Sequence, residues 1–169
     1  MNILFANLYW SYGLDGSLER MKHLHYPLGL ALVAGEIKRR RKDTLFALDS
    51  YQEEIKDEAI FNFIDKNKID CVLLSMYLGN YQYYYVKKFI NNIFRFFPAV
   101  VVILGGPMPT TIPSLLLENI IPSNKRVICV IGEGEETIID LLSCLENNAD
   151  LLKVQGICYW DGKIIFTNP

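Results

Sequence analysis

Short apolar runs recur along the chain and have the length and composition of buried β-strands. Several have no polar interruption, as in "VVVILG" at residues 100–105. A near-continuous apolar run indicates a strand covered on both faces, as in a parallel sheet between two layers of helices. Five such strands are predicted, at residues 2–8, 44–49, 71–76, 100–105 and 126–132.

Longer stretches with helical periodicity separate these runs. The first begins near Pro27, and proline is favoured in the first turn of a helix. The last begins with glutamates, which complement the helix dipole there. Helices are predicted over residues 27–41, 53–67, 80–97, 111–121 and 135–148. The alternation of strand and helix predicts a doubly wound α/β fold with right-handed crossovers.

The last part of the chain has a different pattern. In "GICYWDGKIIFT", two short β-type runs flank Asp161 and Gly162, a pair that is typical of a hairpin turn. We expect residues 1–150 to form the α/β domain. Residues 151–169 are expected to form a C-terminal β-hairpin that caps this domain or leads to something beyond it.

Composition and charge narrow the range of partners. The chain has 169 residues, of which 51% are hydrophobic and 21% charged, and this suits one globular domain. The net charge of −2 gives no case for nucleic acid, which favours a basic face. The one basic run, "KRRRK" at residues 38–42, falls at a predicted helix end, where cations complement the dipole and are usually solvated.

The cysteines and the first residues bear on the compartment. Cys71 and Cys129 fall inside apolar strands, where a free cysteine acts as a small buried hydrophobe, and none of the four cysteines forms a CxxC pair. This usage predicts a reduced, cytoplasmic protein. No signal peptide is recognisable, and no apolar run approaches the roughly 20 residues that span a bilayer.

Glycines cluster where ligands bind in such a fold, beyond the carboxyl ends of the strands. Gly105 and Gly106 follow the fourth predicted strand, and Gly132 and Gly134 follow the fifth. A glycine there serves either a backbone turn with positive φ or the close approach of a flat or bulky ligand. The sequence leaves both explanations open.

Several ligand classes fit this edge poorly. "GEGE" is not the G-x-G-x-x-G fingerprint of dinucleotide sites, and no P-loop lysine motif is present. Glu133 and Glu135 disfavour phosphate and suit a neutral ligand rich in amides or hydroxyls, whereas Glu136 fits simple dipole matching. The first strand ends in "NLYW", without the acidic pair of a phospho-acceptor domain.

Two further clusters of residues leave alternatives open. His23 and His25 could share a metal, but no third ligand is evident and an incidental role is favoured. Four tyrosines in "NYQYYYV" cannot all face one side of a helix, so some are expected to be exposed and at least two to pack on the sheet. These are Tyr81, Tyr83, Tyr84 and Tyr85.

Five motifs in order make the chain resemble the cobalamin-binding domain at the N-terminus of class B radical S-adenosylmethionine (SAM) enzymes. They are "YPLGLALVAGEIKRR", "DCVLLSMY", "VVVILGGPMPT", "VIGEGEETIIDLL" and the hairpin "LLKVQGICYWDGKIIFTNP". The resemblance implies a Rossmann-like, five-stranded parallel sheet with flanking helices and a C-terminal hairpin. It also implies that the corrin lies across the carboxyl edge of the sheet.

The resemblance assigns ten residues to the groove that receives the nucleotide tail of the cofactor. Glycines there permit close approach, a serine can hydrogen-bond, and a tyrosine can pack against a ring. A bulky side chain at Gly106 is therefore expected to block binding and leave the fold intact. The cofactor-binding residues implied are Ser75, Met76, Tyr77, Gly105, Gly106, Pro107, Met108, Gly132, Glu133 and Gly134.

Two departures from family patterns qualify this assignment. The D-x-H-x-x-G signature of methionine-synthase-like domains is absent, so no histidine is assigned as lower cobalt ligand, although His23 and His25 remain outside candidates. The CxxxCxxC motif is also absent, so the 4Fe–4S cluster and SAM are expected only in a radical SAM domain that this chain lacks. We expect an excised or truncated, non-catalytic domain of a methyltransferase or related enzyme.

Two other functions remain open at this stage. The chain could be a degenerate relative that has lost the cofactor and acts as an interaction or scaffold module. It could also be a flavodoxin-like domain that binds flavin. Retention of a corrin band after mixing with hydroxocobalamin and desalting distinguishes cobalamin binding from the scaffold module.

Overall fold

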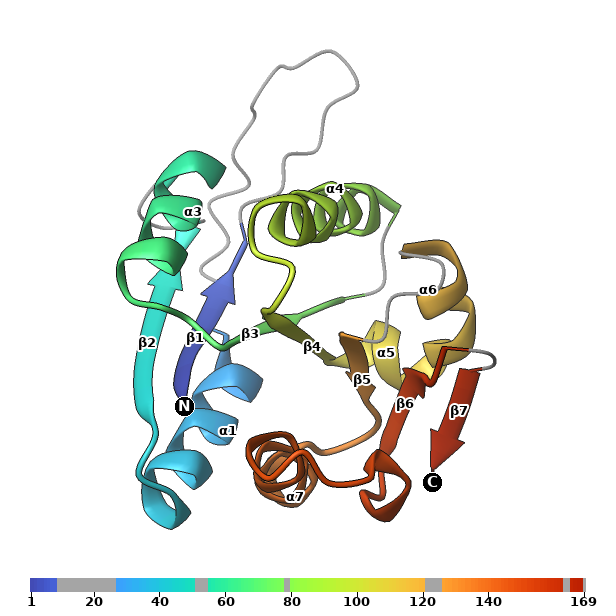
Figure 1. Cartoon of the computed structure of the whole chain (residues 1–169). Coiled ribbons are helices and arrows are strands. Elements are labelled where there is room, and N and C mark those ends of the chain that lie inside the picture. Colours follow the sequence, from blue (N-terminus) through green and yellow to red (C-terminus); the bar gives the residue numbers. More distant parts are fainter. Residues whose placement is uncertain (9–26, 51–54, 78–79, 121–125, 163–164, 169) are drawn as a thin grey trace.

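The structure is a computed structural model, and it describes residues 1–8, 27–50, 55–77, 80–120, 126–162 and 165–168. A single sheet runs through the middle of the molecule, with helices on both of its faces (Figure 1). Among these residues no helix is both long and apolar enough to cross a membrane.

The sheet contains seven strands in the order β2-β1-β3-β4-β5-β6-β7. The first five pair in parallel, β6 pairs antiparallel with β5, and β7 pairs antiparallel with β6. The predicted doubly wound, mostly parallel fold is thereby confirmed, and the predicted hairpin continues the same sheet. The strands are β1 (Asn2–Asn7), β2 (Thr44–Asp49), β3 (Cys71–Ser75), β4 (Val101–Gly105), β5 (Val127–Val130), β6 (Ile157–Trp160) and β7 (Ile165–Asn168).

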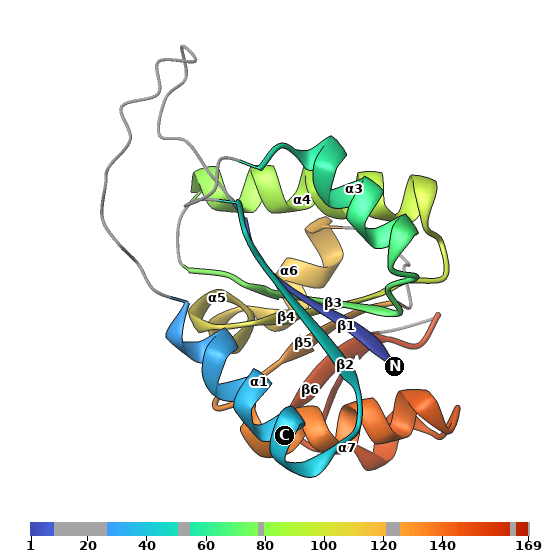
Figure 2. The same cartoon turned by 90° about the vertical axis from the view of Figure 1, so that its left-hand side faces the viewer.

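The helices form two layers that cover opposite faces of the sheet (Figure 2). One layer holds α1 (Leu28–Arg40), α7 (Glu135–Glu146) and the short 3-10 turn η1 (Leu151–Lys153). The other holds α3 (Asp57–Lys66), α4 (Asn80–Phe96) and α6 (Pro113–Ile120), with α5 (Pro107–Thr111) at the sheet edge. Helices on both faces explain the unbroken apolar runs of the central strands.

Alternate side chains of each central strand enter two separate cores. Leu4, Val72 and Val102 pack with side chains of α3, α4 and α6. Ile3, Cys71 and Val101 pack with side chains of α1 and α7. The parallel register places these last three residues side by side, so the alternation is the same in neighbouring strands.

Two helix predictions need correction. The helix predicted over residues 111–121 is α6, which begins at Pro113, and a short helix that was not predicted, α5, precedes it; Ile112 separates the two at φ −135° and ψ 49°. Pro107 occupies the first turn of α5, a position that proline tolerates. The helix predicted over residues 53–67 begins at Asp57 in the described part of the chain.

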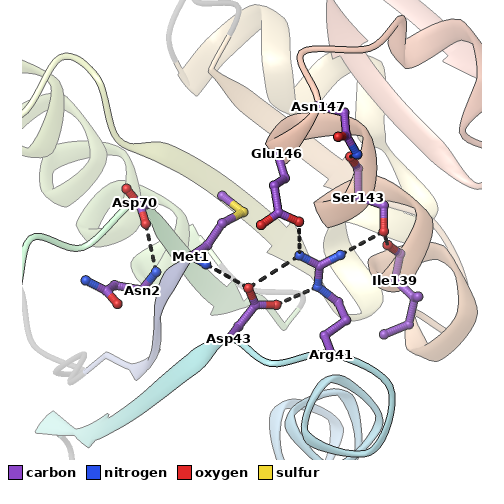
Figure 3. A network of polar contacts seen from close by, with 9 residues as sticks. All are labelled: Met1, Asn2, Arg41, Asp43, Asp70, Ile139, Ser143, Glu146 and Asn147. Atoms are coloured by element: carbon purple, nitrogen blue, oxygen red, sulfur yellow. Dashed lines mark hydrogen bonds and ion pairs between the residues drawn. The ribbon is translucent and has the colours of Figure 1, made fainter.

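A polar network ties together four segments at the amino edge of the sheet (Figure 3). The carboxylate of Asp43, only 3% exposed, accepts hydrogen bonds from the Met1 ammonium at 2.8 Å and from the Arg41 guanidinium. Arg41 also donates to Ser143 Oγ at 2.7 Å and to Glu146 at 2.9 Å. The basic run is therefore not uniformly solvated as predicted, because its Arg41 joins α1, β2 and α7.

The charged groups of this network should make the free energy of unfolding depend on pH, with a maximum between the acidic and the basic range. Burial acts to raise the pKa of the Asp43 carboxyl, but the hydrogen bonds from Arg41 and Met1 outweigh it and hold the pKa below its ordinary value. The hydrogen bond to Asp43 is the main cause that raises the pKa of the Met1 ammonium. Stability from Asp43 is thus lost as pH falls below about 4, and stability from Met1 as pH rises above about 8.

The substitution Asp43→Asn tests this window by thermal unfolding from pH 3 to pH 10. We expect it to lower the free energy of unfolding by about 3 kcal/mol near pH 6 and to flatten the pH profile at both ends, because a partly buried cation loses its partner. Asp65→Asn is the matched control, since Asp65 pairs with Lys68 on the surface with both side chains exposed. A variant whose profile is as curved as that of the unmodified chain would contradict the assignment.

Candidate functional site

A cavity of about 230 Å³ opens at the carboxyl edge of the sheet. Residues at the ends of β3, β4 and β5 form its floor, and residues near the starts of α1 and α7 form its walls. Its lining is mostly apolar or glycine. The lining residues are Gly29, Leu30, Val33, Leu73, Leu74, Ser75, Ile103, Gly105, Gly106, Val130, Gly132, Glu133, Gly134, Glu135 and Ile138.

Gly106 is required by the backbone. Its φ is 99° with ψ −171°, a region that essentially only glycine adopts. A Cβ there would lie 2.9 Å from Met76 O and 3.0 Å from Ser75 Oγ. The loop after β4 thus packs directly on the loop after β3, and no side chain fits between them.

Backbone hydrogen bonds hold these two loops together. Met76 N–H donates to Gly105 O at 2.8 Å, and Met108 N–H donates to Met76 O at 3.1 Å. The parallel pairing of β3 with β4 therefore continues past the last strand pair, Ser75 with Gly105. The floor of the cavity is a hydrogen-bonded surface.

Gly105 and Gly132 differ from Gly106 in having free space where a Cβ would be. No atom lies within 4 Å of a Cβ built at either residue, and both face the cavity. Gly105 has no positive φ, whereas Gly132 has φ 76°. Of the tandem glycines, Gly106 therefore serves the turn, and Gly105 leaves room at the cavity.

The α1 wall of the cavity was not predicted from the sequence. Leu30 and Val33 line the cavity, and Gly29 lies at its rim in the first turn of the helix. The first half of α1, residues 28–35, contains no polar side chain, and Leu28 and Leu32 are 62% and 51% exposed. A helix start that is apolar on all sides was the available signal, because ordinary surface helices carry a polar face.

The cavity is neutral to acidic. Among the lining residues that the structure describes, Glu133 and Glu135 are the only ionisable side chains and Ser75 supplies the only hydroxyl. No basic side chain appears among the described residues that line it. Such a lining disfavours phosphate and suits an uncharged ring system with amide or hydroxyl groups at its edge.

The model of the B12-binding domain family matches residues 17–142 of the chain, well over half of its length. The chain belongs to the B12-binding domain family. The resemblance inferred from the motifs is confirmed by this match, and the structural comparisons agree with it.

Two curated proteins match this B12-binding domain in sequence. An uncharacterized methyltransferase of Pyrococcus horikoshii is 31% identical over 144 residues, which is 85% of this chain and 30% of that protein. An anaerobic magnesium-protoporphyrin IX monomethyl ester cyclase of Synechocystis is 35% identical over 74 residues, which is 43% of this chain and 14% of that protein. The chain thus spans less than a third of the length of either relative.

Solved structures share the fold of this B12-binding domain. The radical SAM methyltransferase TsrM from Kitasatospora setae matches with a TM-score of 0.78 and 15% identity over 99% of this chain and 29% of that one. The cobalamin-dependent radical SAM enzyme OxsB, with aqua-cobalamin and SAM bound, gives a TM-score of 0.79 and 18% identity over 99% of this chain and 22% of that one.

The receiver domain of the response regulator RcsB from Escherichia coli also shares the general fold, with a TM-score of 0.56 and 14% identity over 89% of this chain and 95% of that one. Identities below 20% show shared architecture and do not transfer function.

Six of the ten residues expected to bind the cofactor line the cavity of this B12-binding domain, and four lie elsewhere. Met76 and Met108 are buried in the core on the α4 side, with 0% and 6% exposure. Tyr77 is 47% exposed and Pro107 is also exposed, and neither lines the cavity. The six are Ser75, Gly105, Gly106, Gly132, Glu133 and Gly134. Contact of any of the ten with a cofactor stays a prediction.

The tyrosines at the start of α4 divide between core and surface. Tyr83 and Tyr85 pack against the core, as predicted for at least two tyrosines, and Tyr84 is 68% exposed.

The candidate metal ligands are not brought together in the described part of the chain. His23 and His25 lie outside the described residues. Within the described ranges, His, Cys, Asp and Glu side chains do not gather in threes that could hold a metal. The four cysteines are buried thiols, and burial raises the pKa of Cys71 and Cys129.

The two tandem glycines should respond differently to alanine. Gly106→Ala is expected to lower the free energy of unfolding by roughly 1–3 kcal/mol, because alanine is strained at this φ and meets the Met76 carbonyl. Gly105→Ala is the matched control and should leave stability unchanged, since its Cβ enters free space. Urea unfolding of both variants measures the difference. Equal stability of the two would contradict the close approach of the loops.

Proposed function

We propose that the chain binds cobalamin and positions its corrin at the carboxyl edge of the sheet, as the cofactor-binding domain of a radical SAM enzyme. The observation that supports this most directly is an apolar, glycine-lined cavity that opens at this edge in a member of the B12-binding family. The benzimidazole ring of the nucleotide tail would enter the cavity, and the phosphodiester of the tail and the corrin would lie outside it.

The residues present fit such a ligand. The walls of Leu30, Val33 and Ile138 suit an aromatic ring, and the missing Cβ of Gly105 leaves space for it. Cobalamin carries amide groups around its ring, and the carboxylates of Glu133 and Glu135 can accept hydrogen bonds from amides. Ser75 is the hydroxyl that could orient the tail.

The chain's own residues would bind and orient the cofactor rather than carry out the reaction. Cobalamin when bound supplies a methyl carrier, and the catalytic step would need a radical SAM domain with its 4Fe–4S cluster and SAM. TsrM and OxsB have lengths that leave room for such a domain, because this chain covers 29% and 22% of them. Residues 1–150 would form the cofactor unit, and residues 151–169 would lead toward the catalytic domain.

The compartment follows from the same proposal. Four thiols buried in the core, with no disulfide between them, suit a reducing compartment such as the cytoplasm.

Retention of hydroxocobalamin after desalting, recorded as a visible spectrum, tests the proposal. The unmodified chain should retain a corrin band, and Gly105→Leu should lower affinity at least tenfold, because the leucine side chain fills the cavity. Gly35→Leu is the matched control: its Cβ also meets nothing within 4 Å, and it lies on α1 away from the cavity. Its retention should equal that of the unmodified chain.

Other outcomes would change the assignment. Absence of a corrin band with the unmodified chain would favour a domain that keeps the fold as an interaction module. A flavin spectrum after the same treatment with riboflavin 5′-phosphate would favour a flavodoxin-like function. Equal retention by Gly105→Leu would mean that cobalamin binds elsewhere.

A further inference from the structure

Two polar side chains that do not line the cavity hold in register the three loops that follow β3, β4 and β5 at its floor. They are Gln82 on α4 and Thr110 on α5, and each hydrogen-bonds to the backbone of loops that form the cavity. We propose that both are positioning residues that pre-form the cavity before a ligand enters. The inference rests on the proposed function for the ligand, cobalamin, but the hydrogen bonds that carry it do not depend on that function.

Gln82 fixes the loop after β3. Its side chain is buried, with 6% of the residue exposed. Its Oε1 accepts a hydrogen bond from Tyr77 N–H at 2.7 Å, and its Nε2 donates to Ser75 O at 3.3 Å. One amide side chain thus binds the backbone on both sides of Met76, and it holds Ser75 at the cavity wall from behind.

Thr110 joins the loop after β4 to the loop after β5. Its Oγ1 donates to Gly106 O at 2.9 Å and accepts from Gly132 N–H at 3.0 Å. The ladder between β4 and β5 ends at Leu104 and Cys129, so this hydroxyl bridges the two loops after the strands have stopped pairing. Both hydrogen-bonding roles of the hydroxyl are used.

Together these bonds form a continuous series along the edge of the sheet. Gln82 holds the β3 loop, the Met76 and Gly105 backbones join that loop to the β4 loop, and Thr110 joins the β4 loop to Gly132. A cavity whose loops are already ordered loses less conformational entropy on binding, which raises affinity without any additional contact to the ligand.

Thr110 is better placed for this role than for general stability. The residue is exposed at the rim of the sheet, so removing its hydroxyl leaves no large void and exposes no core. What is lost is the bond that orients Gly132, whose φ of 76° and open Cβ position shape one side of the cavity. The effect of the change should therefore concentrate on binding and on local opening.

Thr110→Val removes the hydroxyl at nearly constant shape and is the decisive variant. We expect exchange of the Gly132 amide hydrogen in the free protein to become about five to ten times faster, and the Kd for hydroxocobalamin to rise about five- to tenfold, which corresponds to one lost hydrogen bond. Thr110→Ser keeps the hydroxyl and should restore both values to within twofold. The thermal midpoint should fall by only about 2–4 °C in Thr110→Val and stay unchanged in Thr110→Ser.

Thr111→Val is the matched control for Thr110→Val. Thr111 Oγ1 donates within α5, to Pro107 O at 2.8 Å, so the loss of this hydroxyl does not affect Gly132.

Gln82→Met tests the second positioning residue. It should accelerate exchange of the Tyr77 amide hydrogen, because Gln82 Oε1 accepts the hydrogen bond from that amide, and it should likewise raise the Kd. Unchanged exchange at Gly132 in Thr110→Val, or an unchanged Kd with normal retention by the unmodified chain, would overturn the inference. If the unmodified chain retains no corrin, the proposed function is wrong, and the exchange rates still decide whether these side chains order the loops.

Discussion

Burial of the central strands on both faces is the constraint on which the rest of this molecule depends. Leu4 and Ile3 are neighbours in β1, yet each is fully buried in a different core. A sheet covered in this way has no free face for polar groups, so the loops and almost all of the chemistry are confined to its two edges. The parallel direction of β1 to β5 then collects all of their carboxyl ends at one edge.

The two edges of the sheet differ in the kind of groups that they hold. At the amino edge, charged groups meet and neutralise one another: Asp43 binds both Arg41 and the Met1 ammonium, and Arg41 reaches α7 (Figure 3). At the carboxyl edge, the described lining of the cavity holds only two acids, and backbone groups and glycines prevail. Ion pairs thus connect the segments at the amino edge, whereas a mostly apolar cavity opens at the carboxyl edge.

Local patterns in the sequence were sufficient for the strands, the hairpin and the position of the glycine loops, since these depend on neighbouring residues. The role of each glycine was not predictable, because it depends on a contact between loops: only the closeness of Met76 O distinguishes Gly106 from Gly105. Met76 directly follows the end of β3, yet its side chain is buried in the core on the α3, α4 and α6 side of the sheet and does not line the cavity. The hydroxyl of Thr110 and the guanidinium of Arg41 likewise gain their roles from partners 22 and 102 residues away.

The apolar first half of α1 affects how strongly molecules of the isolated chain associate with one another in solution. Leu28 and Leu32 keep hydrocarbon surface in water beside a cavity that is itself apolar, at a cost of about 25 cal/mol for each Å² left wet. Two molecules that meet through this patch release that water, whereas a molecule whose patch is covered gains nothing from the encounter. The exposed leucines of α1 therefore favour self-association of the isolated chain, and the small net charge of −2 opposes it only weakly.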